Sequence, residues 1–264
     1  MGKRLFTITH IFMATVMALL FNACLDETPK DKLEEDKLYT SASNLYINTI
    51  GNLYHQIGGY SDSQGLQGTN RGIYDYNTFS TDEAMLPIRG GDWYDGGFWQ
   101  NLYHHEWTST DLPLLNTWNY LYGSVSLCNH ALYEIDQHKQ LLTDEQYKEY
   151  TAEARGLRAL FYFYIMDMWG NVPLVMQEGV TLEDVKQSTR KKVTTTLINE
   201  LLAAIPYLPN AHSNHKGNYY GRFTRPVAYF LVAKILLNHE VYLHDDTLTF
   251  DINGQKLKAL EACI

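Results

Sequence analysis

The sequence predicts an all-α fold, and three observations support this prediction. Apolar and aromatic residues recur at intervals of three and four along several long stretches, which is the spacing of one helix face. Helix-starting and helix-stopping residues such as Thr143, Gly170 and Pro173 flank these stretches. Strand-like alternation of apolar and polar residues is scarce. Pairs of helices therefore dominate the predicted architecture, although their spacing does not keep a strict repeat of about 34 residues.

The first 23 residues have the features of an export signal. Lys3 and Arg4 give a positive start, and the apolar run Ile11–Phe21 is shorter than the roughly twenty residues that span a bilayer. The run ends at Ala23-Cys24, and a small residue before a cysteine is similar to the lipobox of bacterial lipoproteins. We therefore expect a signal peptide over residues 1–23 and a lipid anchor on Cys24. The alternative is an ordinary cleaved secretory signal followed by an incidental cysteine.

The remaining chain is acidic and has little cysteine. Residues 1–23 contain two basic residues and no acidic one, so 19 basic and 30 acidic residues follow them. This balance argues against nucleic acid and anionic membrane surfaces as ligands. Cys128 and Cys263 provide no disulfide framework, and Cys128 is expected to be a small core residue. Residues 24–37 are charged and contain Pro29, which predicts an exposed tether before a helical domain over residues 38–264.

The chain after the tether begins with one helix and two long irregular segments. An apolar stripe predicts a helix over Ser43–Gln56, ended by Gly58 and Gly59. Tyr60–Asn77 is polar and rich in glycine, so we expect a loop there. Thr81–Trp99 has no clear period and is also expected to be a loop.

Thr81–Trp99 is also the best candidate for ligand binding. Two glycine pairs bracket Asp92–Asp95, and such a loop can hold aromatic rings and polar groups at a surface. Arg89, Asp92 and Asp95 could hydrogen-bond neighbouring hydroxyl groups, while Trp93 and Trp99 could stack on a sugar ring. The alternative is that both tryptophans fix the loop onto the helices beneath it.

The next two predicted helices form an antiparallel hairpin. The first covers Pro113–Ile135. The second starts with Thr143 as N-cap and Gln146 as its capping-box partner, contains Thr151–Met168, and ends at Gly170. Small residues on the second helix would allow a neighbour to approach closely. Burial in the core is enough to explain the whole pattern of this second helix.

Three further helices are expected in the rest of the sequence. Val193–Leu208 is one, a helix capped by Thr224 with Pro226 in its first turn is the next, and Leu257–Ile264 begins the last. No cap or helix-breaking residue follows Leu257–Ile264. We therefore expect the sequence to be part of a longer protein.

Common catalytic and metal-binding motifs are missing from the sequence. There is no GxxxxGK[ST], GxGxxG or GxSxG motif. His239 and His244 are five residues apart, about 140° around a helix, so they cannot share one metal ion. His104 and His105 are adjacent and do not face one way. We therefore expect no metal site and no cofactor. A glycosidase that uses two of the carboxylates Asp82, Glu83, Asp92 and Asp95 stays open as an alternative.

Several segments together resemble the SusD/RagB family of outer-membrane, nutrient-binding lipoproteins. TAEARGLRALFYFYIMDMWGNVPLV, at residues 151–175, is similar to the most recognisable segment of that family. TDEAMLPIRGGDWYDGGFWQNLYHHEWTSTD is similar to its early loop, and GRFTRPVAYFLVAKILLNHEVYL is similar to a later helix. The segments occur in family order, and Cys24 fits the lipoprotein start.

The resemblance implies tetratricopeptide-like helix pairs with long irregular loops. It implies a non-catalytic protein, anchored by lipid to the outer membrane and facing outward. Such a protein binds an oligosaccharide or another nutrient and delivers it to a TonB-dependent, SusC-like barrel. By position, the resemblance implies six ligand-binding residues: Arg89, Asp92, Trp93, Trp99, Asn101 and Trp107. Two alternatives remain: a secreted α-helical glycoside hydrolase, and a scaffold that braces the barrel without binding a ligand.

Overall fold

The computed structural model describes residues 38–58, 65–66, 72–245 and 247–263. The predicted signal peptide, Cys24 and the tether lie outside these residues. The residues from Tyr39 onward form one folded unit. In the described part of the chain, no helix is long and apolar enough to cross a membrane.

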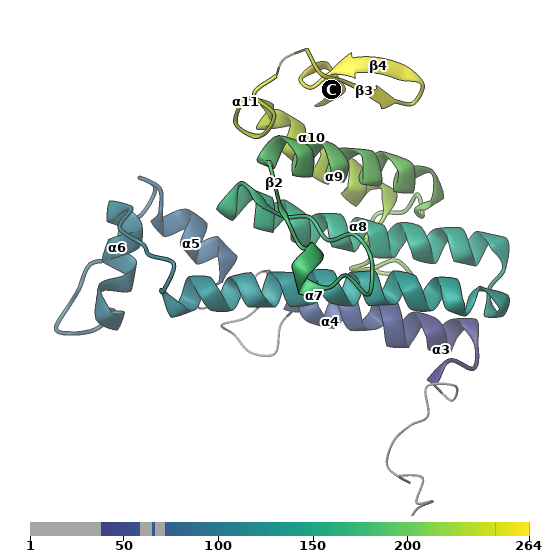
Figure 1. Cartoon of the computed structure of the whole chain (residues 1–264), viewed down its shortest axis with the longest axis horizontal. Coiled ribbons are helices and arrows are strands. Elements are labelled where there is room, and N and C mark those ends of the chain that lie inside the picture. The colour runs from purple at the N-terminus through teal and green to yellow at the C-terminus, as the bar shows by residue number, and fades with distance from the viewer. Residues whose placement is uncertain (1–37, 59–64, 67–71, 246, 264) are drawn as a thin grey trace, which may run out of the picture. The chain divides into compact units, whose positions relative to one another are not determined.

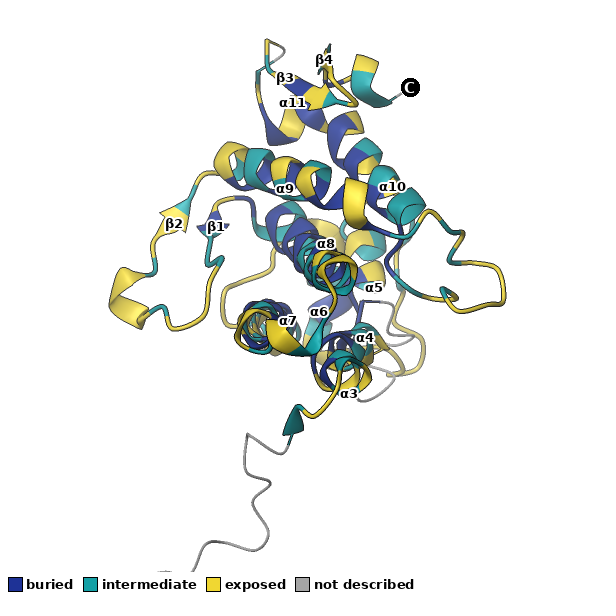
Figure 2. Cartoon of the chain, turned by 90° about the vertical axis from the view of Figure 1, so that its right-hand side faces the viewer, coloured by how far each residue is buried: buried dark blue, intermediate teal, exposed yellow. Residues whose placement is uncertain are grey.

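The predicted all-α architecture is confirmed, and its main helices stack in chain order (Figure 1). Each main helix packs against the next, and the view in Figure 2 shows α8 between α7 on one side and α9 on the other. The stack consists of α3 (Ala42–Tyr46), η1 (Ile47–Gly51, π-helical), α4 (Asn52–Gly58), α7 (Leu112–Gln137), α8 (Asp144–Trp169), α9 (Arg190–Ala204) and α10 (Arg225–Leu237).

Short elements join or flank this stack. α5 and α6 form a small lobe beside the N-terminal end of α7 (Figure 1), and a two-stranded hairpin of β3 and β4 follows α11. These elements are α5 (Ile73–Phe79), η2 (Asp95–Gly97), α6 (Phe98–His104), η3 (Lys139–Leu141), β1 (Val172–Pro173), η4 (Leu182–Asp184), β2 (Gln187–Ser188), η5 (Ile205–Tyr207), α11 (His239–Tyr242), β3 (Thr249–Ile252), β4 (Gln255–Lys258) and η6 (Glu261–Cys263). β1 pairs with β2 in antiparallel fashion across the connection from α8 to α9.

The central helix α8 begins and ends as the sequence predicts. The Thr143 hydroxyl accepts a hydrogen bond from the Gln146 backbone N–H at 3.2 Å, and the Gln146 side chain accepts one from the Thr143 N–H at 3.0 Å. This reciprocal capping box satisfies two helix-end donors. Gly170 ends the helix with a φ of 75°, which a residue with a Cβ rarely adopts. Cys128, on α7, is buried in the core as predicted.

The small residues of α8 allow close packing by a loop residue. Phe223 lies against Gly156 so closely that a Cβ on Gly156 would be 2.3 Å from the Phe223 ring. We expected a helix to approach the small residues, and at Gly156 the neighbour is the segment that leads into α10.

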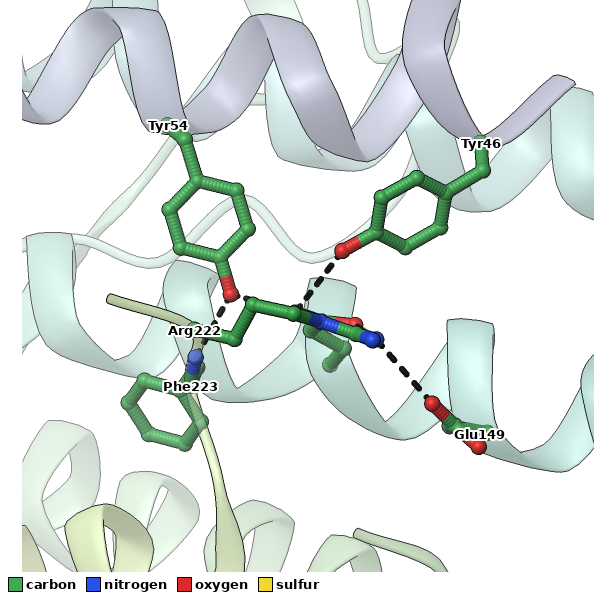
Figure 3. A network of polar contacts seen from close by, with 6 residues as sticks. Tyr46, Tyr54, Glu149, Arg222 and Phe223 are labelled. Atoms are coloured by element: carbon green, nitrogen blue, oxygen red, sulfur yellow. Dashed lines mark hydrogen bonds and ion pairs between the residues drawn. The ribbon is translucent and has the colours of Figure 1, made fainter. Parts of the chain in front are cut away.

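A buried carboxylate on α8 ties three distant segments together (Figure 3). Glu153 is 0 % exposed and accepts hydrogen bonds from the Tyr46 hydroxyl at 3.1 Å, from the Tyr54 hydroxyl and from Arg222, whose Nη2 lies 2.5 Å from Oε2. Arg222 also pairs with Glu149 at 3.0 Å. A buried charge is tolerated when it is paired and fully hydrogen-bonded, which is the case for Glu153.

The protonation equilibria of this cluster follow from its burial. Burial and the neighbouring Glu153 carboxylate both raise the pKa of Tyr54 above its ordinary value. Burial by itself lowers the pKa of Arg222, but the hydrogen bonds and charge of Glu153 overcome this effect and raise it. Tyr54 and Tyr46 are therefore neutral donors, and Arg222 is a permanent cation, throughout the physiological pH range.

A second polar cluster fixes the chain that crosses over α7 and α8. Arg158 donates hydrogen bonds to Asn129 at 2.8 Å, to the Met176 carbonyl at 2.7 Å and to Glu200 of α9 at 2.6 Å. Tyr162 donates to the Val175 carbonyl at 3.0 Å and accepts from the Val175 N–H at 2.6 Å. The irregular crossover thus receives its backbone partners from helix side chains.

Several predicted elements differ from the structure. Residues 73–79 and 98–104 form α5 and α6, although we expected loops over Tyr60–Asn77 and Thr81–Trp99. Two short aromatic-rich helices form there because their apolar sides pack against each other and against Leu114 and Met168. Local periodicity does not show these contacts, since they join residues far apart in the sequence.

The predicted helix at the end of the sequence is also wrong. Residues 249–258 form the β3–β4 hairpin, whose turn places Asn253 and Gly254 at positive φ, and residues 261–263 form one 3₁₀ turn. Asn-Gly is a strong turn signal that apolar spacing alone missed. Thr224 is the N-cap residue of α10, but its hydroxyl makes no capping hydrogen bond.

We predict that Gly156→Ala destabilises the protein. The new methyl group would overlap the Phe223 ring, and overpacking of this kind costs about 1–3 kcal/mol. Gly123→Ala, at an exposed position of α7, is the matched control, because a Cβ there meets no atom within 4 Å and alanine favours the helix by up to about 1 kcal/mol. Urea unfolding of both variants measures the difference. A Gly156→Ala variant as stable as Gly123→Ala would contradict this packing.

Candidate functional site

The glycine-bracketed loop begins with a tight turn. The Asp92 N–H donates to the Arg89 carbonyl at 2.9 Å, and Gly90 and Gly91 have φ angles of 60° and 89°. A two-residue turn with positive φ at both central positions is that of a type I′ hairpin, which explains the glycine pair. Arg89 and Asp92 are exposed at the ends of this turn.

Trp93 and Trp99 have different environments. Trp93 is 50 % exposed, whereas Trp99 is 1 % exposed and donates its indole N–H to Asp95 at 2.7 Å. The two rings meet edge to face with their centroids 6.3 Å apart. Trp99 therefore holds the loop on the lobe and offers no ring face to a ligand, as the alternative interpretation expected. Trp93 rests on Trp99 and remains available for stacking.

The remaining predicted contacts lie on and after α6. Asn101 is half-buried on this helix, and Trp107 follows it with 46 % exposure. The Trp107 ring packs against the His105 ring, with the two ring centroids 5.3 Å apart. The structure thus places Arg89, Asp92 and Trp93 on one turn, while Trp107 lines a separate cleft.

This cleft lies between the lobe and the paired ends of α7 and α8. Its volume is about 590 Å³, within the range typical of small-molecule sites. Trp107 and Ser109 line it from the loop before α7, Trp118 from α7, and Asp167 and Trp169 from α8. The rings of Trp118 and Trp169 meet edge to face at 5.2 Å.

Trp118, Asp167 and Trp169 were not among the residues predicted for the site. Trp118 was interpreted as part of the apolar stripe of a predicted helix. Asp167 and Trp169 lie at the end of the next predicted helix, and burial in the core was enough to explain the pattern of that helix. The signal that could have found them is the antiparallel hairpin, which brings the start of α7 to the end of α8 and so collects their aromatic residues.

The described residues contain no cluster of three or more metal-binding side chains. His239 is buried and contacts the Leu236 carbonyl through Nδ1 at 3.1 Å. The four candidate carboxylates are all exposed: Asp82, Glu83, Asp92 and Asp95. Asp95 already accepts a hydrogen bond from the Trp99 indole N–H. The arrangement offers ring faces and hydrogen-bonding groups, which is the chemistry of binding.

Comparison with known proteins adds a family match. A SusD-like family model, described as starch-binding and associating with the outer membrane, matches residues 65–237. A SusD-like protein of Bacteroides ovatus is 27 % identical over 244 residues, which cover 89 % of this chain and 40 % of that protein. The chain therefore spans about 40 % of the length of this relative.

Solved structures show the same fold. Surface glycan-binding protein A from Bacteroides fluxus superposes with a TM-score of 0.63 at 19 % identity, covering 76 % of this chain and 41 % of that one. The protein of that name from Bacteroides thetaiotaomicron, in complex with laminarihexaose, gives a TM-score of 0.60 at 20 % identity, with 76 % and 40 % covered.

The contrast between the two loop tryptophans predicts different effects on stability. Trp99→Ala removes a buried ring and should cost about 3–5 kcal/mol, whereas Trp93→Ala should stay within about 1 kcal/mol of the wild type because half of the ring is in water. If the lobe unfolds separately from the helix stack, a local probe such as hydrogen exchange in α6 will report the loss. Equal protection of α6 in both variants would contradict the role assigned to Trp99.

Proposed function

The chain belongs to the SusD-like family, which associates with the outer membrane, and from this premise we propose that it is part of a non-catalytic, cell-surface, glycan-binding lipoprotein. We further propose that the protein delivers an oligosaccharide or another nutrient to a TonB-dependent, SusC-like barrel. The lipid on Cys24 would hold it at the outer membrane, facing outward.

One observation supports glycan binding by this chain more than any other: the half-exposed ring of Trp93 on a glycine-rich turn. The turn is fixed by backbone hydrogen bonds and by the buried Trp99, so the Trp93 ring is preorganised. Arg89 and Asp92 beside it supply a charged donor and a charged acceptor for hydroxyl groups. Preorganised aromatic and polar groups bind with little ordering cost.

The relatives support the class of ligand. The related structure from Bacteroides thetaiotaomicron contains laminarihexaose, a glucose oligomer with no charge. A neutral ligand is compatible with an acidic protein, since no charge repulsion opposes its approach. Because the chain spans about 40 % of its relative, the rest of the protein would supply further ligand contacts.

The helix stack supports the partner proposal. Its helices bury most of their apolar residues within the stack, while α10 exposes Phe230 and Leu237, which are seven residues apart and so lie on one face of the helix. A stack of this kind is a rigid surface for a large partner, as in other helical-repeat proteins. The barrel would hold this surface while the loops hold the glycan.

We predict that Trp93→Ala weakens glycan binding by the mature full-length protein. Loss of one stacking face should raise the dissociation constant for laminarihexaose or soluble starch by about two- to tenfold in isothermal titration. Tyr207→Ala is the control, because this side chain is 51 % exposed on η5 and lies outside the loop. An unchanged affinity of Trp93→Ala would remove the loop from the site, and a wild-type protein that binds no glycan would remove the glycan proposal itself.

The anchor and partner have a separate test. Cys24→Ala should release the protein from the outer-membrane fraction, because no acyl chain would then hold the N-terminus. The Trp93→Ala protein should remain in that fraction and co-purify with a barrel protein. Retention of Cys24→Ala in the membrane after a salt wash would contradict the lipid anchor, and absence of a barrel from the wild-type complex would contradict the partner.

A further inference from the structure

The cleft between the α5–α6 lobe and the α7–α8 ends has the composition of a carbohydrate site. Trp107, Trp118 and Trp169 supply indole rings along its wall. Trp107 is 46 % exposed, so much of this ring faces solvent and is available to a ligand. A pyranose ring has apolar C–H faces that pack on aromatic rings, while its hydroxyl groups remain at the edge.

The cleft also contains polar groups that could hydrogen-bond the hydroxyl groups at the edge of a pyranose ring. Tyr242 donates a hydrogen bond to Oδ1 of Asp167 at 2.5 Å and fixes the carboxylate, while Oδ2 can accept from a ligand hydroxyl. The exposed side chains of Asn77 and Ser109 line the cleft as well and supply an amide and a hydroxyl group. The cleft therefore combines donors and acceptors with its aromatic wall.

Charge narrows the class of ligand. No lysine or arginine is among the described residues that line the cleft, and Asp167 is its one ionisable carboxylate. An anionic ligand would lack a positive partner and would face this carboxylate. A compact metal ion would bind the carboxylate, amide and hydroxyl oxygens, but it would leave the aromatic wall of Trp107, Trp118 and Trp169 without a role. A neutral polyol uses both the rings and the polar groups.

We propose that this cleft is a second saccharide subsite, which binds a neutral hexose ring between Trp107, Trp118 and Asp167. The proposal rests on the glycan-binding function and adds a site away from the Arg89–Asp92 turn. It gives the C-terminal end of α8 a direct role in ligand recognition. It also assigns a role in ligand binding to the α5–α6 lobe, which forms the opposite wall of the cleft.

The test compares cleft variants of the mature full-length protein with matched controls. Trp107→Ala and Asp167→Asn should each raise the dissociation constant for laminarihexaose or soluble starch, up to about tenfold. Tyr133→Ala is the control for Trp107, because it is 47 % exposed and lies far along α7. Asp136→Asn is the control for Asp167, because Asp136 also accepts a tyrosine hydroxyl, from Tyr147 at 3.0 Å. Both controls should bind as the wild type does.

A thermal-unfolding midpoint for each variant separates binding from folding. Asn77→Ala changes an exposed side chain and should not affect folding. Its affinity for the glycan therefore tests the cleft even if one of the other two cleft variants unfolds. The proposal is overturned if the wild type binds the glycan and folded Trp107→Ala, Asp167→Asn and Asn77→Ala all bind equally well, a result that leaves the glycan-binding function intact. A wild-type protein that binds neither glycan overturns both proposals.

Discussion

The rest of the structure depends on one buried charge, the carboxylate of Glu153 at the middle of the central helix. A carboxylate without water is costly unless every oxygen finds a donor, and here the donors come from two other segments. Tyr46 and Tyr54 lie on the first helical segment, and Arg222 precedes α10. The same requirement that stabilises the charge therefore fixes the positions of elements far apart in the sequence. Phe223, next to Arg222, packs on Gly156 one helical turn after Glu153, so apolar and polar contacts specify the same arrangement.

Arg158 has the corresponding role on the side of α8 that faces the crossover. It binds Asn129 of α7, the Met176 carbonyl and Glu200 of α9, and so connects three consecutive layers. Glu153 and Arg158 both lie within the segment that resembles the family signature. Their contacts give that signature a physical meaning, because an apolar residue at either position would leave several buried donors or acceptors without partners. The rigid stack in turn gives the lobe a fixed base at Leu114 and Met168.

The sequence was most informative about long helices and least informative about the lobe. The capping box at Thr143 and Gln146 and the Gly170 stop are local signals, and the structure confirms both. α5 and α6 are only seven residues each, too short to be stable alone, and exist because Tyr76, Phe98 and Leu102 pack together. For the candidate site, the sequence selected the glycine-bracketed loop within Thr81–Trp99, and the structure shows that Arg89 and Asp92 of this loop are exposed. It could not tell Trp93 from Trp99, because the five residues between them form the short turn η2 and the start of α6, and the packing of these elements decides which ring is buried.

The sequence by itself determined the long helices, the glycine-bracketed loop, the absence of common catalytic motifs and the resemblance to a family. Each of these depends on local spacing or on residue type, which the sequence contains directly. The tertiary structure alone decided the partners of Glu153, the burial of Trp99 and the gathering of Trp107, Trp118 and Asp167 around one cleft. These features join residues that are far apart in the chain or separated by irregular loops. Their positions follow from how the helices pack, and no periodicity in the sequence records that packing.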